Sequence, residues 1–509
     1  MEEQHVFSKA SFDGTPEALA VLIDSATGKG DQAALCEAIK FADEVESRCA
    51  PQDACLVCYY RSNAWAALHQ LRTKVTNPWC WELPELQEQI YWLRRAITHE
   101  GYSQLPPSRR AQFHCNLGNL LNTVGRFVEA LDEWEHALRE QPILGIARGN
   151  LGRGLVDYGL FLSDSGNQYL FLHRGAQELE RAIVGGVDRD GSTYPEAIAA
   201  FESWLVKVKD MLGDDTKDRL LPICSLGRSR REREYRQWSL DKKLFLNPLN
   251  DLGVESVAAC DALTLPSHSA NKHGITLLAF FNQLKQEYVY ARWCLYEGSH
   301  SRSVNFSDRE VVLAFNADMA LYSMGIEQIK TAFRCAYSLL DKIAYFVNHY
   351  WQLGISEKQV NFRNVWFENP RATEKQLHKK FESSTNQPLR GLFWLSKDIY
   401  IKNHAVMHPS ARELDSLRNH LEHKYVKVVY ALSSMASEFD VFPDNLAHQV
   451  QQDELVRKTE YLLRQSRSAL IYLCLAMDYE ESQIQAGHDD VIALMEYGTY
   501  SDNQKVLYY

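Results

Sequence analysis

The sequence predicts an all-α protein in which a helical solenoid is followed by a second helical bundle. In the N-terminal half, apolar residues recur at intervals of three and four, breakers are few, and no strong alternating strand pattern is present. In the C-terminal half, segments 324–351 and 411–435 each carry one apolar stripe at the same spacing. A chain of 509 residues is too long for one compact core, so two or three domains are expected.

Composition and charge narrow the classes of function. The chain is 45% hydrophobic and 24% charged, which is typical of globular proteins. Its net charge of −11 argues against coating nucleic acid through bulk positive charge, so any nucleic-acid site must be local. No apolar run reaches the roughly 18 residues that span a bilayer, and the opening MEEQHVFSKA lacks the order of a signal peptide. We therefore expect a cytoplasmic protein with no membrane partner.

The cysteines and histidines do not predict a metal site. The 11 cysteines are scattered and odd in number, which fits reduced thiols, and the close pair Cys55 and Cys58 has no second pair at zinc spacing. His404 and His408 have i, i+4 spacing, but Pro409 follows at once and no third ligand stands out. His408 is expected to pack or cap at the start of the next helix. Neither a metal nor a cofactor is expected.

Residues 116–142 have the spacing of a tetratricopeptide repeat. The pattern positions are Leu117, Gly118, Leu121, Gly125, Phe127, Ala130, Trp134, Ala137 and Pro142. Gly118 and Ala130 are small where two antiparallel helices would touch, and Trp134 would fill the groove between them. This agreement predicts a helix–turn–helix unit.

The repeat pattern implies neighbours on both sides. A further start, Leu151-Gly152, lies 34 residues after Leu117-Gly118. One repeat cannot bury its own apolar face, so more helices are expected before it. The candidate stretches are 33–49, 54–72 and 85–99. The resemblance implies a tetratricopeptide-like solenoid over residues 1–215 that binds a protein partner or trigger on its concave surface.

Residues 216–270 are predicted to connect the two regions. From Arg228 to Lys243 there are seven Lys and Arg against three acids, with Tyr235 and Trp238 interleaved. Such a strip suits RNA contact, because basic groups neutralise phosphate and aromatic rings stack on bases. A solvated connecting helix is the favoured interpretation. The stretch 244–253, with its Pro and Asn residues, is predicted to be a loop between domains.

The segment 411–435 presents a polar face opposite its apolar stripe. The stripe consists of Leu414, Leu417, Leu421, Tyr425, Val428, Leu432 and Met435. At about 100° per residue, Asn419 and His423 lie almost opposite the leucines. Arg418 lies on the flank, and its long side chain can reach toward the same surface. We expect these three residues to face solvent, a ligand or another chain.

Arg418, Asn419 and His423 form an R-x4-H pattern similar to that of HEPN ribonucleases, in which a polar residue often follows the arginine. Similar spacings occur at Arg94 to His99, Arg109 to His114 and Arg371 to His378, the first two within the repeat region. Context favours the match at Arg418. The segments that resemble a bacterial HEPN family often found behind tetratricopeptide repeats are 235–251, 388–399 and 408–425. The resemblance implies a HEPN helical bundle over 271–480, followed by a polar tail, 481–509.

The resemblance implies a metal-independent RNA endonuclease. RNA supplies its own nucleophile, the 2′-OH, and cleavage needs proton transfer together with positive charge at the phosphate. Histidine suits the first task, because its unperturbed pKa lies near 6.5, and the permanently charged fork of arginine suits the second. We expect His423 to be the general acid/base, Arg418 the phosphate clamp and Asn419 the orienting group. Asp341 is a candidate partner for Arg418, and a surface role for it is equally open. The products would carry 2′,3′-cyclic phosphate and 5′-OH ends.

The same resemblance implies partners. HEPN domains of this kind are usually active as dimers in which two such helices face one cleft, so a homodimer is expected. A regulated toxin or anti-phage effector that cuts RNA, with transfer RNA among its candidate substrates, is the leading hypothesis. The alternative is a non-catalytic repeat scaffold whose HEPN-like domain binds RNA or a nucleotide and does not depend on Arg418 and His423. A metal-dependent hydrolase is disfavoured for lack of a ligand set.

Overall fold

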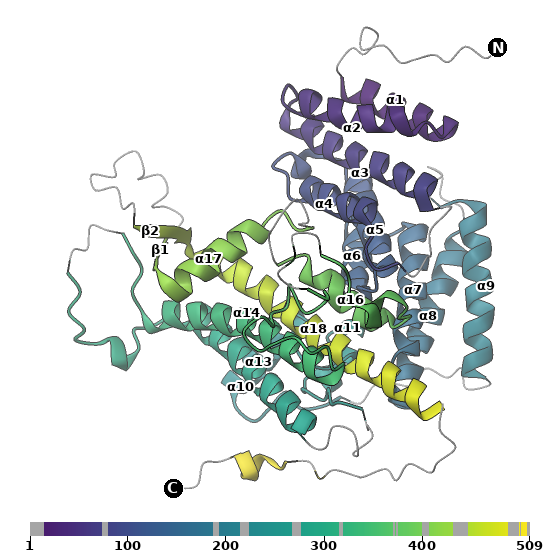
Figure 1. The fold of residues 1–509 in the computed structure, drawn as a ribbon. Helices are drawn as coiled ribbons and strands as arrows, with labels where there is room; N and C mark the ends of the chain where they lie inside the picture. The colour runs from purple at the N-terminus through teal and green to yellow at the C-terminus, as the bar shows by residue number, and fades with distance from the viewer. Residues whose placement is uncertain are drawn as a thin grey trace, which may run out of the picture.

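The computed structural model describes residues 15–73, 80–186, 193–213, 223–266, 276–314, 319–369, 372, 375–399, 407–430, 446–486, 498 and 500–505. Within them most residues are helical and few are in strands, which confirms the all-α prediction. The strands described are a single pair. Figure 1 shows the helices of residues 16–212 as one stacked array, with a second bundle beside it.

In the array, each helix packs mainly against its neighbours in the chain. Its helices are α1 Pro16–Lys29, α2 Gln32–Glu46, α3 Pro51–Thr73, α4 Pro84–Ile97, α5 Pro107–Thr123, α6 Phe127–Glu140, α7 Gly145–Leu160, α8 Ser165–Gly185 and α9 Pro195–Leu212, with the short 3-10 turn η2 Tyr102–Gln104 before α5. The predicted stretches 33–49, 54–72 and 85–99 correspond to α2, α3 and α4, so these three expected helices are confirmed.

The pair α5 and α6 packs as the small residues predict. A Cβ added at Gly118 would lie 2.6 Å from the Trp134 indole nitrogen, so only glycine allows this approach. The same indole nitrogen donates a hydrogen bond to the Asn119 side chain at 3.0 Å. The turn between the helices contains Gly125 at a φ of +86°, a left-handed conformation that favours glycine. The helix–turn–helix unit is therefore real, and its assignment as a tetratricopeptide repeat stays a prediction.

The second bundle is built mainly from three long helices, α13, α14 and α18. Its elements are α10 Arg230–Asp241, α11 Leu249–Leu252, η3 Ser256–Ala258, α13 Thr276–His300, η4 Phe306–Asp308, α14 Met324–Tyr350, α15 Lys379–Glu382, α16 Gln387–Ser396, α17 Ala411–His423, β1 Tyr425–Val429, β2 Ala447–Gln451, α18 Gln452–Ala486 and η7 Asp502–Lys505. The apolar stripe predicted for α14 is buried at every position: Ile329, Phe333, Tyr337, Leu340, Ala344 and Val347.

The predicted helix 411–435 is wrong beyond His423. There α17 ends, and the chain continues as β1, which pairs in parallel with β2 and places Val428 opposite Val450. The run Tyr-Val-Lys-Val-Val explains the change, because β-branched residues restrict χ1 and fit a pleated, half-buried surface better than a helix. Of the expected stripe, Leu414, Leu417 and Val428 are buried, Leu421 is half-buried and Tyr425 is exposed. Leu432 and Met435 lie outside the described residues.

The stretch 244–253 contains only a one-turn helix, α11, and is buried at the centre of the molecule instead of lying at its surface. Arg467 of α18 donates to the carbonyl oxygens of Phe245 at 2.6 Å and Asn247 at 3.0 Å, and pairs with Asp251 at 2.6 Å. Irregular backbone can be buried when its polar groups find such partners.

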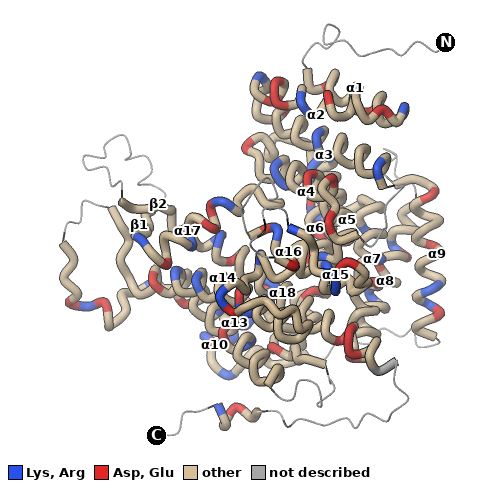
Figure 2. The backbone as a smooth tube through the Cα atoms, in the orientation of Figure 1, with Lys and Arg blue, Asp and Glu red and all other residues tan. Residues whose placement is uncertain are grey.

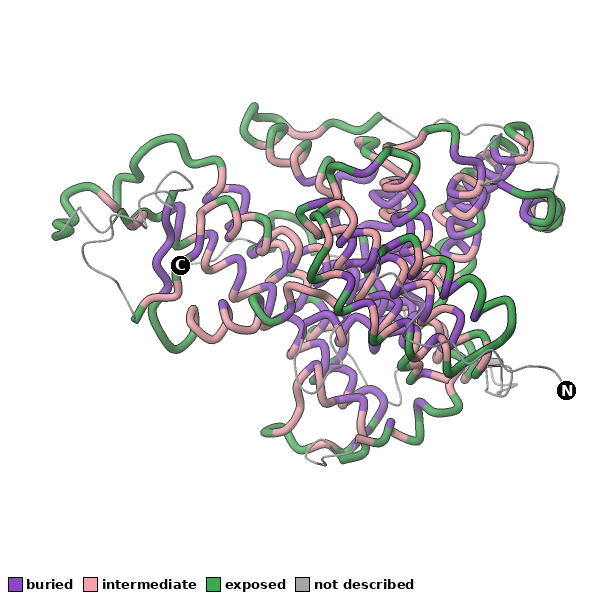
Figure 3. Tube along the Cα trace, turned by 90° about the horizontal axis from the view of Figure 1, so that it is seen from above, coloured by how far each residue is buried: buried purple, intermediate pink, exposed green. Residues whose placement is uncertain are grey.

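The array and the second bundle share one hydrophobic core. Phe127 at the start of α6 packs edge-on against Tyr472 of α18, with ring centroids 5.0 Å apart. The Tyr472 hydroxyl donates to Glu129 and accepts from the Val128 backbone N–H at 3.1 Å. Figure 3 shows buried residues running continuously through the middle of the molecule. No helix among the described residues is long and apolar enough to cross a membrane.

Candidate active site

Helix α17 is fixed on the second bundle by one apolar edge. Ser410 precedes its first turn, and Leu414 and Leu417 are fully buried. The helix lies against α14, and Lys458 of α18 pairs with Glu413 at 2.9 Å. These contacts set the rotation of α17 and leave its opposite face turned away from the core.

Arg418 is half-buried, and among the described residues no carboxylate forms an ion pair with it. The centre of its guanidinium lies 5.5 Å from the centroid of the Tyr337 ring on α14, within cation–π range. One of its nitrogens, Nη1, donates to the Asn419 side-chain oxygen at 3.1 Å. The Asn419 amide donates in turn to Asp415 at 3.4 Å. Within the part of the chain that the structure describes, the guanidinium donates no further hydrogen bond, so its other N–H groups can bind an incoming anion.

His423 is the last residue of α17, and its side chain is exposed. No hydrogen bond joins it to Arg418 or to Asn419 in the described structure. The exposed position matches the predicted polar face. Asn419 is more buried than that face implied, because its amide lies between Arg418 and Asp415. The structure thus brings two of the three predicted residues together and leaves the histidine one turn away.

The neighbouring histidines have structural partners. The Nδ1–H of His420 donates to the Ser416 carbonyl at 2.7 Å, and its ring stacks on His448 of β2 at 4.7 Å. His408 accepts from the Ser410 backbone N–H at 3.2 Å and lies 4.7 Å from the Tyr461 ring. Burial, with Arg94 nearby, lowers the pKa of His408 to about 3, so this ring is a neutral packing group. His404 lies outside the described residues.

The other arginine–histidine matches either contain residues with partners in the structure or lie partly outside the described residues. Arg94 is buried and pairs with Asp398 at 2.6 Å. His114 is buried and bonds to Glu133 at 2.6 Å. Arg371 lies outside the described residues. Of the matches within the described structure, that at Arg418 combines an arginine free of acids with an exposed histidine.

The basic strip of α10 is better explained as a connecting helix. Arg230 pairs with Glu234 at 2.7 Å, Arg231 with Glu297, and Arg236 with Glu232 at 3.2 Å. The ring of Tyr235 packs edge-on against Trp293 of α13, at 5.0 Å. Figure 2 shows both signs of charge interspersed along this part of the chain. These three arginines are engaged by acids, Arg233 donates to backbone carbonyl oxygens, and the aromatic rings pack against α13.

Two neighbours of Arg418 were not identified from the sequence. Tyr337 was placed on the core stripe of α14, and its hydroxyl also donates to Asp415 at 3.5 Å. Asp415 lies three residues before Arg418 and four before Asn419, which is the spacing of neighbours on one helical face. That spacing was the available signal. Asp341, the suggested partner, accepts from the Phe362 backbone N–H at 3.0 Å.

The C-terminal region is similar to HEPN domains, helical domains that are generally ribonucleases. The matching family is LA2681-like HEPN, whose model covers residues 269–480. This range contains α13, α14, α17, both strands and most of α18, and with them Arg418, Asn419 and His423. No curated protein matches the chain.

Proposed function

We propose that this protein is a metal-independent RNA endonuclease whose site is built on α17. The observation that carries the proposal is Arg418, a guanidinium held over Tyr337 that pairs with no acid of the described residues, on the same helix as the exposed His423. The similarity of residues 269–480 to HEPN domains supplies the class of reaction.

Each residue has a distinct role in the proposed reaction. Arg418 binds the scissile phosphate with paired hydrogen bonds and stabilises the charge that gathers there. His423 transfers the protons, taking one from the 2′-OH or giving one to the departing 5′-oxygen. Asn419 holds the guanidinium through its side-chain oxygen. The products are a 2′,3′-cyclic phosphate and a 5′-OH.

We propose that the active form is a homodimer joined through the HEPN domain. The reaction needs two proton transfers, and one α17 offers one exposed histidine at this face. Arg418 and His423 do not touch within a chain, which fits a site completed by a second α17. Two copies facing one cleft would supply both histidines and both arginines.

The array is proposed to regulate this activity. Helical solenoids bind proteins on their concave surfaces, so residues 1–215 would bind a protein partner or trigger. The connector 216–270 would transmit this binding to the catalytic domain 271–480, which precedes the tail 481–509. A nuclease kept inactive until triggered fits a toxin or anti-phage effector. Transfer RNA is a candidate substrate.

The test is incubation of the purified chain with total RNA and with transfer RNA in EDTA, followed by analysis of the fragment ends. Wild type should give cyclic phosphate and 5′-OH ends, and Arg418→Ala and His423→Ala should each lower the rate at least 100-fold. Arg412→Ala, an exposed arginine on the same helix, is the matched control and should cut normally.

The other outcomes separate the remaining hypotheses. Cutting by both variants at the wild-type rate would place the chemistry elsewhere. RNA that binds the wild-type chain with the array's trigger supplied, and stays intact, would favour a non-catalytic scaffold.

A further inference from the structure

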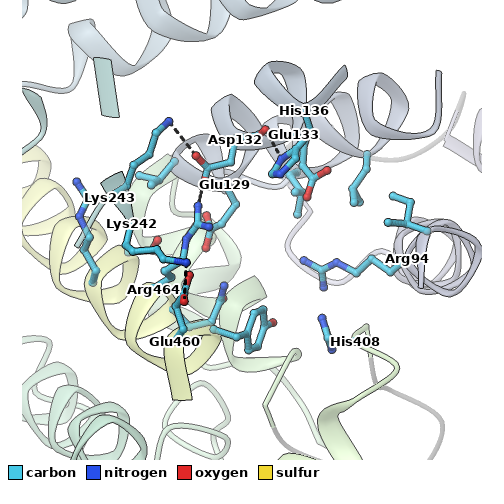
Figure 4. A pocket seen from close by; sticks show the side chains of 18 of the residues that line it. Arg94, Glu129, Asp132, Glu133, His136, Lys242, Lys243, His408, Glu460 and Arg464 are labelled. Carbon is cyan, nitrogen blue, oxygen red and sulfur yellow. Dashed lines mark hydrogen bonds and ion pairs between the residues drawn. The ribbon is translucent and has the colours of Figure 1, made fainter. Parts of the chain in front are cut away.

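A polar cavity of about 400 Å³ lies where the array meets α18, outside the α17 site. Figure 4 shows its wall: Asp132, Glu133 and His136 come from α6, Arg94 from α4, and Glu460 and Arg464 from α18. Most charges in this wall already have partners. Arg464 pairs with Asp132, and Lys242 with Glu460 at 3.0 Å. Glu133 and His136 form the part of the wall that continues toward α5.

There, three side chains from two helices converge. His114 of α5 and Glu133 and His136 of α6 each place one potential ligand atom within 4.8 Å of the others. The His114 Nδ1 lies 2.6 Å from a Glu133 oxygen, and the two imidazole rings stack with centroids 5.2 Å apart. His114 is buried, and the other two are half-buried. Stacked histidines beside a single carboxylate form a compact donor set of two nitrogens and one oxygen.

The hydrogen bonds around the two imidazole rings leave one nitrogen of each ring available to bind a metal. The Nδ1 of His136 lies 2.7 Å from the Asp132 carbonyl oxygen, so Nδ1 carries the proton and Nε2 keeps a free lone pair. The Nε2 of His114 lies 2.8 Å from the Tyr102 hydroxyl, so this nitrogen can donate there while Nδ1 faces Glu133. Metal-binding histidines commonly have such a partner on the other nitrogen.

We propose that His114, Glu133 and His136 bind one zinc-class divalent cation between α5 and α6. Two imidazoles and a carboxylate suit zinc and similar transition metals, whereas calcium and magnesium prefer all-oxygen ligands. Tetrahedral zinc with bonds of about 2.1 Å needs donor atoms about 3.4 Å apart, which small side-chain rotations would reach from the observed separations. The fourth position faces the cavity, because Glu133 and His136 line it, and is open to water or to an anion.

The proposed metal would join the two helices of the central unit in the array. All three ligands precede residue 269, so the site belongs to the array and does not share a residue with α17. Glu133 is one residue from Asp132, the acid that pairs with Arg464 of α18. A cation held here therefore acts at the junction between the array and the second bundle.

The experiment is a metal titration of the full chain after chelator treatment and dialysis. Zinc chloride binding is followed by calorimetry, and cobalt chloride binding by visible absorption. Wild type should bind one equivalent, with the d–d bands of four-coordinate cobalt and no thiolate-to-cobalt charge-transfer band. That last feature separates this site from adventitious binding by the exposed thiols of Cys224 and Cys260.

The variants locate the site. Glu133→Gln keeps the shape and removes the charge, and His136→Gln removes the free nitrogen; each should abolish the saturable binding. Tyr102→Phe removes the hydroxyl beside His114 and should weaken zinc binding about 10- to 100-fold. The matched controls are Glu140→Gln, an acid on the same helix that pairs with Arg110, and His173→Gln on α8; both should bind like wild type.

Two results would overturn the proposal. One is equal binding by wild type, Glu133→Gln and His136→Gln, which would assign the cation to other residues. The other is no saturable binding by a wild-type chain whose thermal unfolding is cooperative. The cluster would then be a hydrogen-bonded clamp between α5 and α6, and Glu133→Gln would lower the unfolding temperature with or without zinc.

Discussion

The arginines at the junction and the arginine of α17 are held in opposite ways. Arg126, at the start of α6, is fully buried and bonds to Asp398 at 2.5 Å, to Glu129 at 3.1 Å and to the Gln465 amide oxygen at 2.9 Å. Arg418 is half-buried and bonds to one amide above one aromatic ring. The first charge is already neutralised inside the protein. The second is positioned but pairs with no acid of the described residues, which is the state that a phosphate-binding group requires.

The pKa of the buried Asp398 reflects this pairing. Burial alone would raise the pKa of Asp398, but Arg126 and Arg94 lower it to about 2. Asp398 follows α16 of the second bundle, while both arginines belong to the array. Because Asp398 stays ionised, these ion pairs hold the two parts of the molecule together. Substitutions at the junction should therefore change the stability of the protein, whereas substitutions on α17 should change its chemistry.

The largest expected effect comes from breaking the buried set at Arg126. Arg126→Met would leave Asp398 with Arg94 as its one charged partner in the described structure and would remove the arginine that pairs with Glu129. Losing one partner of a buried pair typically costs about 3–5 kcal/mol. We expect a large fall in the unfolding temperature, measured by calorimetry or circular dichroism. Arg153→Ala, at a surface pair with Asp157, is the control and should cost less than about 1 kcal/mol. Equal losses would show that the junction does not depend on the buried charges.

A second effect is a pH dependence of stability centred on His408. Its folded pKa of about 3 lies below the ordinary histidine value of 6.5, so between these pH values the unfolded chain binds a proton that the folded chain does not bind. Stability is then complete above pH 6.5 and falls as the pH is lowered, by about 1.4 kcal/mol per unit and about 3 kcal/mol near pH 4.5.

His408→Gln should flatten this fall, as measured by urea unfolding from pH 7 to 4, while His173→Gln should follow wild type. Asp398 adds in the same direction at lower pH: its depressed pKa of about 2 means that its stabilisation is lost as the pH falls from 3.8 toward 2. Identical slopes for wild type and His408→Gln would show that the ring is hydrated in solution.

The helices were predictable because helix formation leaves a local signal. The stripe of α14 and the small residues of the α5–α6 pair follow from spacings of three and four, which the structure reproduces at Phe333 and Gly118. The end of α17 was not predicted, because Tyr425 and Val428 also continue the helical spacing. Pairing with β2, more than 15 residues later in the chain, decides between helix and strand.

The candidate site was predictable in part for the same reason. The exposure of His423 follows from its angle to Leu414 and Leu417, which is a local property. The surroundings of Arg418 depend on Tyr337 of a different helix, which no local pattern reveals. The cluster of His114 with Glu133 was missed because its members come from two helices and match no zinc spacing.

The smallest effect on stability, and the sharpest test of the comparison, is Arg418→Lys. Lysine keeps a positive charge above Tyr337, so the unfolding free energy should change by less than about 1 kcal/mol. It is a point charge without the planar fork, so RNA cleavage should still fall nearly as far as in Arg418→Ala. Arg412→Lys on the same helix controls for the substitution itself. If Arg418→Lys instead keeps the wild-type rate, Arg418 contributes only its charge, and the paired hydrogen bonds assigned to it are wrong. If Arg418→Lys lowers the unfolding free energy as much as Arg126→Met does, Arg418 is a structural arginine and the contrast between the two regions fails.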